Sequence, residues 1–143
     1  MRDLHNQIRI MRSVSPVAIG TTGTGKTGTI VDRKDYDAVE FEFSYGTITA
    51  TNAAFTATVL HGDVTGTMTS IADTDLIGTE ALAGIAAGTP RTSGSNKNVT
   101  KRLGYTGLKR YVQGKVVSTI TAGTPVGINV ILGMPKTAPV TNP

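Results

Sequence analysis

Hydrophobic and polar residues alternate most regularly over residues 36–43. Val39, Phe41 and Phe43 fall on one side of an extended chain there, and Glu40 and Glu42 fall on the other. A period of two is the pattern of a β-strand with one face in the core and one in water. We therefore expect the three apolar side chains to point inward and the two glutamates to face solvent.

Short segments of similar character recur along the rest of the chain, separated by Gly, Pro and polar turn residues. Such spacing is typical of antiparallel strands joined by tight turns. The predicted strands are residues 14–19, 29–31, 36–43, 55–60, 67–69, 100–105, 109–120 and 126–132. About eight short strands predict an all-β fold, an antiparallel β-sandwich or jelly roll, and not alternating βα units.

The remaining segments predict loops and extended ends. Pro16 makes residues 14–19 either an edge strand or an extended arm. Residues 20–28 are almost wholly Gly and Thr, which predicts a loop or a tight hairpin connection. Residues 74–88 are the one candidate helix, but three glycines interrupt them, so we expect a loop with a single helical turn.

The length of 143 residues suits a single domain. We expect one β jelly-roll domain over residues 1–143, with residues 1–13 as an N-terminal arm. The prolines at 135, 139 and 143 predict that residues 134–143 form a tail that does not pair as a regular strand and runs over a neighbour or into solvent.

Composition removes several classes of chemistry. The chain has no cysteine, so disulfides, thiolate nucleophiles and sulfur-ligated metals are excluded. Charged residues interrupt the first dozen positions, and no apolar run approaches the length of a membrane helix. We expect a soluble protein with no signal for export and no membrane partner.

Charge is distributed unevenly along the chain. Residues 1–80 hold six Lys or Arg and ten Asp or Glu, whereas residues 81–143 hold eight Lys or Arg and no acid. The two parts carry −4 and +8, which gives the net charge of +4. A basic half can bind nucleic acid, but halves of opposite sign equally suit docking on a complementary protein or on a second copy. The same charges can also be dispersed over a solvated surface.

One motif imitates a nucleotide site. Residues 20–27 read GTTGTGKT and match the phosphate-loop pattern, with Gly20, Gly25, Lys26 and Thr27 at its defining positions. That loop works between a buried strand and a helix whose first N–H groups hold the phosphates. Here a glycine and a β-branched run follow the motif, and a proline interrupts the segment before it. We interpret the match as spurious, the product of a composition rich in Gly and Thr, and expect no cofactor.

Other candidate sites are weaker still. His5 and His61 are the only histidines, and Asp63 near His61 does not make a metal site without a further ligand. The acidic residues 32, 35, 37, 40 and 42 could bind a cation but fit a solvated turn and strand face better. We expect neither a metal site nor a catalytic residue, and hence no enzyme.

Two runs of residues resemble virion proteins of tailed bacteriophages. Residues 28–41 read GTIVDRKDYDAVEF and are followed by Gly46, and residues 103–112 read LGYTGLKRYV. Both are similar to strand and turn motifs of phage capsid decoration proteins, also called cement proteins, and the ending over residues 128–135 is similar as well. The resemblance covers residues 28–60 and 100–135, and residues 62–99 match nothing in it.

The resemblance implies a jelly-roll cement protein that sits as an oligomer on the outer surface of a capsid and reinforces it. The implied partners are the major capsid protein and a second copy of the chain, as a homodimer. The family has no catalytic residues to carry over. Its motifs are structural, so they bear on fold more directly than on function.

The basic stretch supplies the candidate contact residues. Arg102, Lys109, Arg110 and Tyr111 lie in and beside the second motif, where the cations could face carboxylates of a partner or be solvated. Two alternatives to capsid decoration stay open: a receptor-binding or tail-associated jelly roll, and a basic β-barrel that binds nucleic acid. Aromatic residues make up only 5% of the chain and Trp is absent, so stacking platforms for bases or sugars are scarce.

Overall fold

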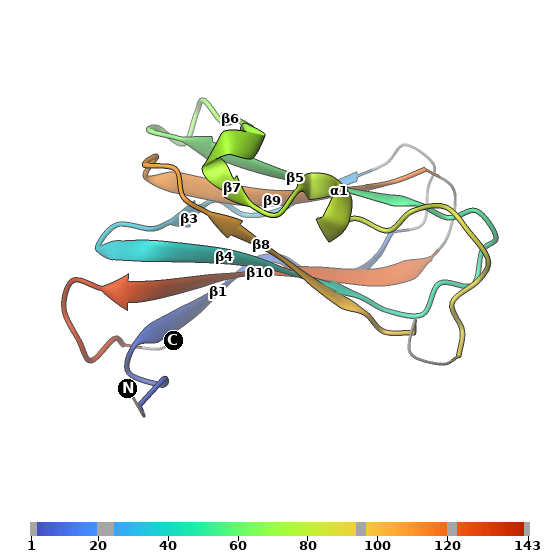
Figure 1. Ribbon diagram of the computed structural model, residues 1–143, viewed down its shortest axis with the longest axis horizontal. Coiled ribbons are helices and arrows are strands. Elements are labelled where there is room, and N and C mark those ends of the chain that lie inside the picture. Colours follow the sequence, from blue (N-terminus) through green and yellow to red (C-terminus); the bar gives the residue numbers. More distant parts are fainter. Residues whose placement is uncertain (1–2, 20–24, 94–96, 120–122, 142–143) are drawn as a thin grey trace.

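The computed structural model describes residues 3–19, 25–93, 97–119 and 123–141. Two antiparallel sheets lie face to face, with one short helix at the side (Figure 1). The first sheet has the order β1-β10-β4-β8-β7, with the bounds Ile8–Ile19, Thr124–Pro135, Tyr36–Tyr45, Thr100–Tyr105 and Leu76–Ile77. The second has the order β2-β9-β5-β6, with the bounds Gly25–Thr27, Tyr111–Ser118, Phe55–Gly62 and Thr69–Ser70, and β3 (Val31–Asp32) also pairs with β9.

The strand pairs are nested. The first strand, β1, pairs with the last, β10, and β2 and β3 pair with the next to last, β9. Inside these, β4 pairs with β8 and β5 with β6. A ribbon of nested antiparallel pairs folded into two facing sheets is a jelly roll. The predicted all-β sandwich of jelly-roll type is confirmed.

The core lies between the sheets, and β4 shows how the sequence builds it. Val39, Phe41 and Phe43 are buried, and the latter two are fully inaccessible. Glu40 and Glu42 lie on the opposite, outer face and are partly exposed. The register predicted from the alternation is therefore correct, because a slip of one residue would have exchanged the two faces.

On one side of the sandwich, β1 closes the gap between the sheets. It is an edge strand, as expected from Pro16, and its register with β10 shifts between Arg12 and Val14. At that bulge the Ser13 carbonyl accepts a hydrogen bond from the Thr29 N–H at 2.7 Å, and the Ser13 hydroxyl oxygen accepts one from the Gly114 N–H at 3.1 Å. The bulge turns β1 toward the second sheet.

On the other side, residues 71–93 cover the gap. They include a 3₁₀ turn (Asp73–Asp75) and the single-turn helix α1 (Glu80–Ala83), which Thr79 caps by accepting a hydrogen bond from the Leu82 N–H. The single helical turn predicted within residues 74–88 is confirmed. The buried Tyr45 hydroxyl donates to the Ala83 carbonyl at 2.9 Å and joins α1 to the core.

Both chain ends are more tightly bound to the domain than expected. Strand β1 begins at Ile8, so residues 8–12 of the predicted arm are paired with β10, because their apolar residues complete the sheet. In the predicted tail, β10 extends to Pro135, and the N–H groups of Lys136 and Val140 donate to the carbonyls of Asp35 and Asn6. The described part of the tail, residues 134–141, thus lies along its own chain.

The sandwich has two distinct ends. The Leu108 end holds the turn at residues 33–35 and the loop at residues 106–110; the Lys101 end holds Arg91, Lys97 and the start of β8. Both chain termini lie at the Leu108 end, on the left of Figure 1. None of the helices in the described residues has the length and apolar character needed to span a membrane.

Candidate interaction surface

The exposed loop at residues 106–110 is held in place by several contacts at the Leu108 end. The Lys109 N–H donates to the Tyr105 hydroxyl at 3.1 Å, and the Arg33 guanidinium donates to the Gly107 carbonyl. Arg33 also lies over the Tyr105 ring, 5.5 Å from its centroid. A Cβ on Gly107 would come within 2.5 Å of the Tyr105 ring, so this close approach requires glycine.

Two ion pairs fix the second half of this loop. Lys109 pairs with Asp63, and Arg110 makes two hydrogen bonds, of 2.7 and 3.0 Å, to the Asp32 carboxylate. The hydrogen bond from Arg110 lowers the pKa of Asp32, and the bond to Asp63 raises the pKa of Lys109. Asp63 directly follows β5 and Asp32 ends β3, so the two pairs tie the loop to two different segments of the second sheet.

Three of the four residues predicted to contact a partner lie close together in the structure. Lys109, Arg110 and Tyr111 come together at the Leu108 end, and the Arg110 guanidinium lies 5.0 Å from the centroid of the Tyr111 ring. Arg102 lies apart from them, on the outer face of β8, with a side chain that is 84% exposed and 3.6 Å from Glu40. The cations thus have carboxylate partners in their own chain, and contact with another protein stays a prediction.

The residue that the loop presents to solvent is Leu108. Its side chain is 93% exposed, the highest value among the exposed large apolar residues in the described chain. Sequence reasoning passed over it, because a single leucine beside two basic residues carries no motif. The feature that could have indicated its exposure is its position between Gly107 and Lys109, in a loop that holds it away from both sheets.

The histidine and acidic candidates have structural roles. The His61 Nδ1 lies 2.9 Å from the Tyr105 hydroxyl, and the neighbouring Asp63 forms an ion pair with Lys109. Glu42 accepts a hydrogen bond from Asn129 at 2.7 Å, and Asp32 is bound by Arg110. Within the described residues, no three His, Asp or Glu side chains gather closely enough to hold a metal ion.

Only part of the segment that matches the phosphate-loop pattern lies within the described residues. Gly20 lies outside the described residues, while Gly25, Lys26 and Thr27 form strand β2, which pairs with β9 and is exposed. The expected loop over residues 20–28 is therefore a strand in its second half. A strand at this position lacks the helix N-terminus that holds phosphates in nucleotide sites.

Comparison with known proteins identifies the fold. No family model and no curated protein matches the sequence. Among solved structures, the PBSX exported protein XepA is similar, with a TM-score of 0.54 and 12% identity, over 94% of this chain and 40% of that chain. The VP2 subviral particle of infectious bursal disease virus is similar too, with a TM-score of 0.53 and 9% identity, over 91% of this chain and 33% of that chain.

The chain thus spans well under half of either protein, and at such identities the likeness shows the fold alone.

Proposed function

We propose that this protein is a non-enzymatic virion protein that decorates and stabilises a tailed-phage capsid from its outer surface by bridging subunits of the major capsid protein. The proposal joins the resemblance of residues 28–60 and 100–135 to cement proteins with a jelly-roll fold. The observation that carries it is Leu108, a fully exposed apolar side chain on a loop held by two ion pairs.

The physical case for Leu108 as a contact residue rests on preorganisation. An interface anchor is an apolar side chain that fills a pocket of the partner, surrounded by polar groups that exclude water. Ordering a flexible loop on binding costs free energy, which a loop already fixed by Arg33, Lys109 and Arg110 avoids. Burial of one leucine contributes about 1.5–3 kcal/mol. On a capsid the same contact repeats many times, so a modest interface is sufficient.

The structure gives less support to nucleic-acid binding. A stacking platform needs an exposed aromatic face, but Tyr105 is only 4% exposed and Arg110 lies over the Tyr111 ring. Lys109 and Arg110, which would contact phosphates, are paired with Asp63 and Asp32. The receptor-binding alternative has no observation of its own in its favour.

Self-association as a homodimer belongs to the same proposal. Ile10 on the outer face of edge strand β1 is 51% exposed and lies opposite Ile131 of β10, which leaves apolar surface for a second copy. Sedimentation equilibrium of the purified protein tests this part, and a monomer at micromolar concentration would contradict it.

The Leu108 contact can be tested with particles that lack the protein. Purified wild-type protein is expected to bind them, and Leu108→Ser to bind about tenfold more weakly or worse, in line with the loss of one buried leucine. Leu4→Ser, which changes another exposed leucine (63% exposed), is the matched control and should bind like wild type. Equal binding by the Leu108 and Leu4 variants would overturn the assignment of this anchor.

A further inference from the structure

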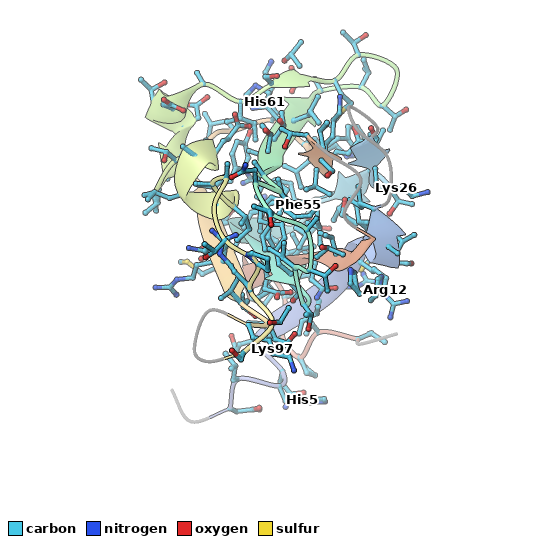
Figure 2. The ribbon with its side chains drawn as sticks, turned by 90° about the vertical axis from the view of Figure 1, so that its right-hand side faces the viewer. His5, Arg12, Lys26, Phe55, His61 and Lys97 are labelled. Atoms are coloured by element: carbon cyan, nitrogen blue, oxygen red, sulfur yellow. The ribbon has the colours of Figure 1, made fainter. Side chains whose placement is uncertain are left out.

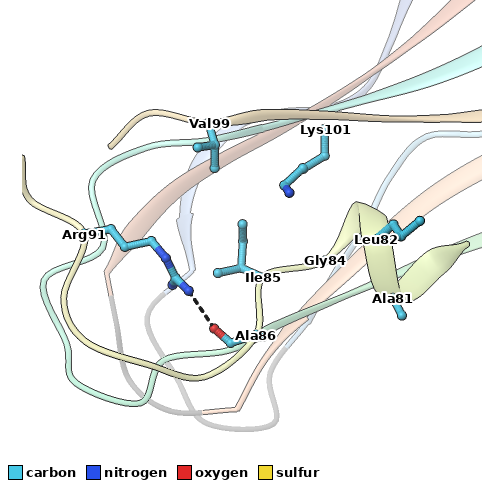
Figure 3. A pocket seen from close by; sticks show the side chains of 8 residues that line it. All are labelled: Ala81, Leu82, Gly84, Ile85, Ala86, Arg91, Val99 and Lys101. Atoms are coloured by element: carbon cyan, nitrogen blue, oxygen red, sulfur yellow. Dashed lines mark hydrogen bonds between the residues drawn. The ribbon is translucent and has the colours of Figure 1, made fainter. Parts of the chain in front are cut away.

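A pocket at the Lys101 end combines two cations with apolar walls. It has a volume of about 300 Å³ and lies between α1, the segment that follows it, and the start of β8 (Figure 3). The residues that line it are Ala81, Leu82, Gly84, Ile85, Ala86, Arg91, Val99 and Lys101. None of them is acidic.

Lys101 reaches this pocket because it occupies an inward-facing position of its strand. It lies opposite Phe43 in the β4–β8 register, as Leu103 lies opposite Phe41, and both phenylalanines are buried. Directly opposed residues of antiparallel strands share a face. The Lys101 side chain is therefore directed between the sheet and the segment after α1, as Figure 3 shows, and not into bulk solvent.

Lys101 is half-buried, and even partial burial raises the free-energy cost of an ammonium without a carboxylate partner. Lys101 makes no ion pair or side-chain hydrogen bond within the described chain. All ten Asp and Glu residues belong to that part of the chain. The acid of α1, Glu80 at its start, already accepts a hydrogen bond from the Val59 N–H at 2.6 Å.

Arg91 supplies the second cation. Its guanidinium donates through Nη2 to the Ala86 carbonyl at 3.0 Å, while Nη1 is covered and has no hydrogen-bond partner. The backbone of Arg91 pairs with Ile48, which places the side chain firmly at the pocket wall. Lys101 and Arg91 thus both line one small, partly apolar space, and neither forms an ion pair within the described residues.

We propose that this pocket receives the carboxylate of an acidic side chain from a partner protein. A single negative charge on a short aliphatic stem fits the site: the carboxylate meets Lys101 and Arg91, and its methylene groups pack on Ile85, Val99 and Leu82. Inorganic phosphate fits less well, because it has no aliphatic stem to pack on these apolar walls.

The inference deepens the proposed function and rests on it for the identity of the partner. The pocket lies at the opposite end of the sandwich from Leu108. A protein that bridges two subunits needs two separate contact surfaces, and these ends would provide them. The binding chemistry itself can be tested on the isolated protein.

The test is a titration followed by amide chemical shifts, at constant ionic strength, with sodium propionate in one arm and sodium phosphate in the other. Propionate is expected to shift the amides of Ala86, Arg91 and Lys101 saturably, and phosphate at equal concentration is not. Lys101→Gln should weaken propionate binding about tenfold, the loss of one charge-assisted hydrogen bond.

Lys26→Gln, an exposed lysine on β2, is the matched control and should leave binding unchanged. Arg91→Gln is a second variant, though it also removes the bond to Ala86. The absence of saturable shifts, equal or stronger binding of phosphate, or unchanged binding by Lys101→Gln would each overturn the site. The titration uses the isolated protein and needs no particles. Failure to bind propionate would therefore not contradict the proposed capsid role. Conversely, absence of the protein from virions would not contradict a carboxylate site confirmed by titration.

Discussion

Phe41 lies at the centre of the first sheet, where it pairs with Val130 of β10 on one side and Leu103 of β8 on the other. All three side chains are buried, so a truncated Phe41 would leave a cavity that its neighbours cannot fill from either strand. Its neighbour Glu40 lies on the outer face, where its one ion pair among the described residues is a long one, with Arg102. The two positions differ in burial although they are adjacent in sequence.

Phe41→Ala is accordingly expected to lower the free energy of unfolding by about 3–5 kcal/mol, enough to unfold a marginally stable domain. Glu40→Ala should change it by less than about 1 kcal/mol, since exposed ion pairs contribute little. Urea unfolding of both variants measures the difference. A larger loss in the glutamate variant would mean that the strand faces the other way.

A second prediction at the scale of residues concerns how the stability of the fold depends on pH. The hydrogen bond from Arg110 lowers the pKa of Asp32 below its usual value of 3.8, so the folded state binds this proton more weakly than the unfolded state. Stability from the pair is present above the unfolded pKa and is lost as pH falls through the lower, folded pKa.

Asp32→Asn should therefore be less stable than wild type at neutral pH, and the gap between their melting temperatures should close below about pH 4. The matched control is Asp37→Asn, which alters an exposed acid of β4. A gap that stays constant down to pH 2 would exclude the ion pair as its source.

At the scale of elements, the sequence was most informative where one face of a strand is buried. The alternation over residues 36–43 correctly predicted which side chains of residues 39–43 face the core, and Pro16 limited residues 14–19 to an edge strand or an extended arm, of which the structure shows the edge strand. Residues 25–27 were expected in a loop, yet they form β2, because β9 offers backbone partners that local propensity does not reveal.

The candidate site was only partly predictable for a related reason. The basic residues of the 109–111 segment were singled out, but their partners Asp63 and Asp32 lie 46 and 78 residues away. The inward direction of Lys101 depends on the pairing of β8 with β4, a contact distant in sequence. Such pairings follow from topology, which no local pattern contains.

Because residues 25–27 form a strand, we also predict that nucleotides do not change the stability of the protein. Lys26 lies in an exposed strand opposite Val116 (Figure 2), so Lys26→Ala should leave both stability and function nearly unchanged. Thermal melts with and without Mg²⁺ and ATP or GTP are expected to superimpose. A rise in melting temperature with nucleotide, abolished by this substitution, would contradict the interpretation of the motif as spurious.

At the scale of the whole molecule, two opposite ends carry different chemistry. Paired charges surround an exposed leucine at the Leu108 end, while Lys101 and Arg91, which form no ion pair within the described residues, line a pocket at the Lys101 end. Nested strand pairs hold these ends at a fixed separation, which suits a rigid bridge between neighbouring capsid subunits.

Particles lacking the protein are therefore expected to assemble but to release DNA at a lower temperature than complete particles. Adding purified wild-type protein should restore the release temperature, because in the proposed role each copy would connect two subunits and the contacts would act together. Fluorescence of a DNA-binding dye during heating measures the release. Identical release temperatures for all three preparations would argue against a stabilising role.

The most direct measurement of the central claim is a density map of purified particles with and without this protein. The account predicts added density on the outer surface, over the joints between major capsid protein subunits, with a jelly-roll domain contacting a different subunit at each end. Absence of the protein from the particles, or its presence inside the shell against DNA, would contradict the account.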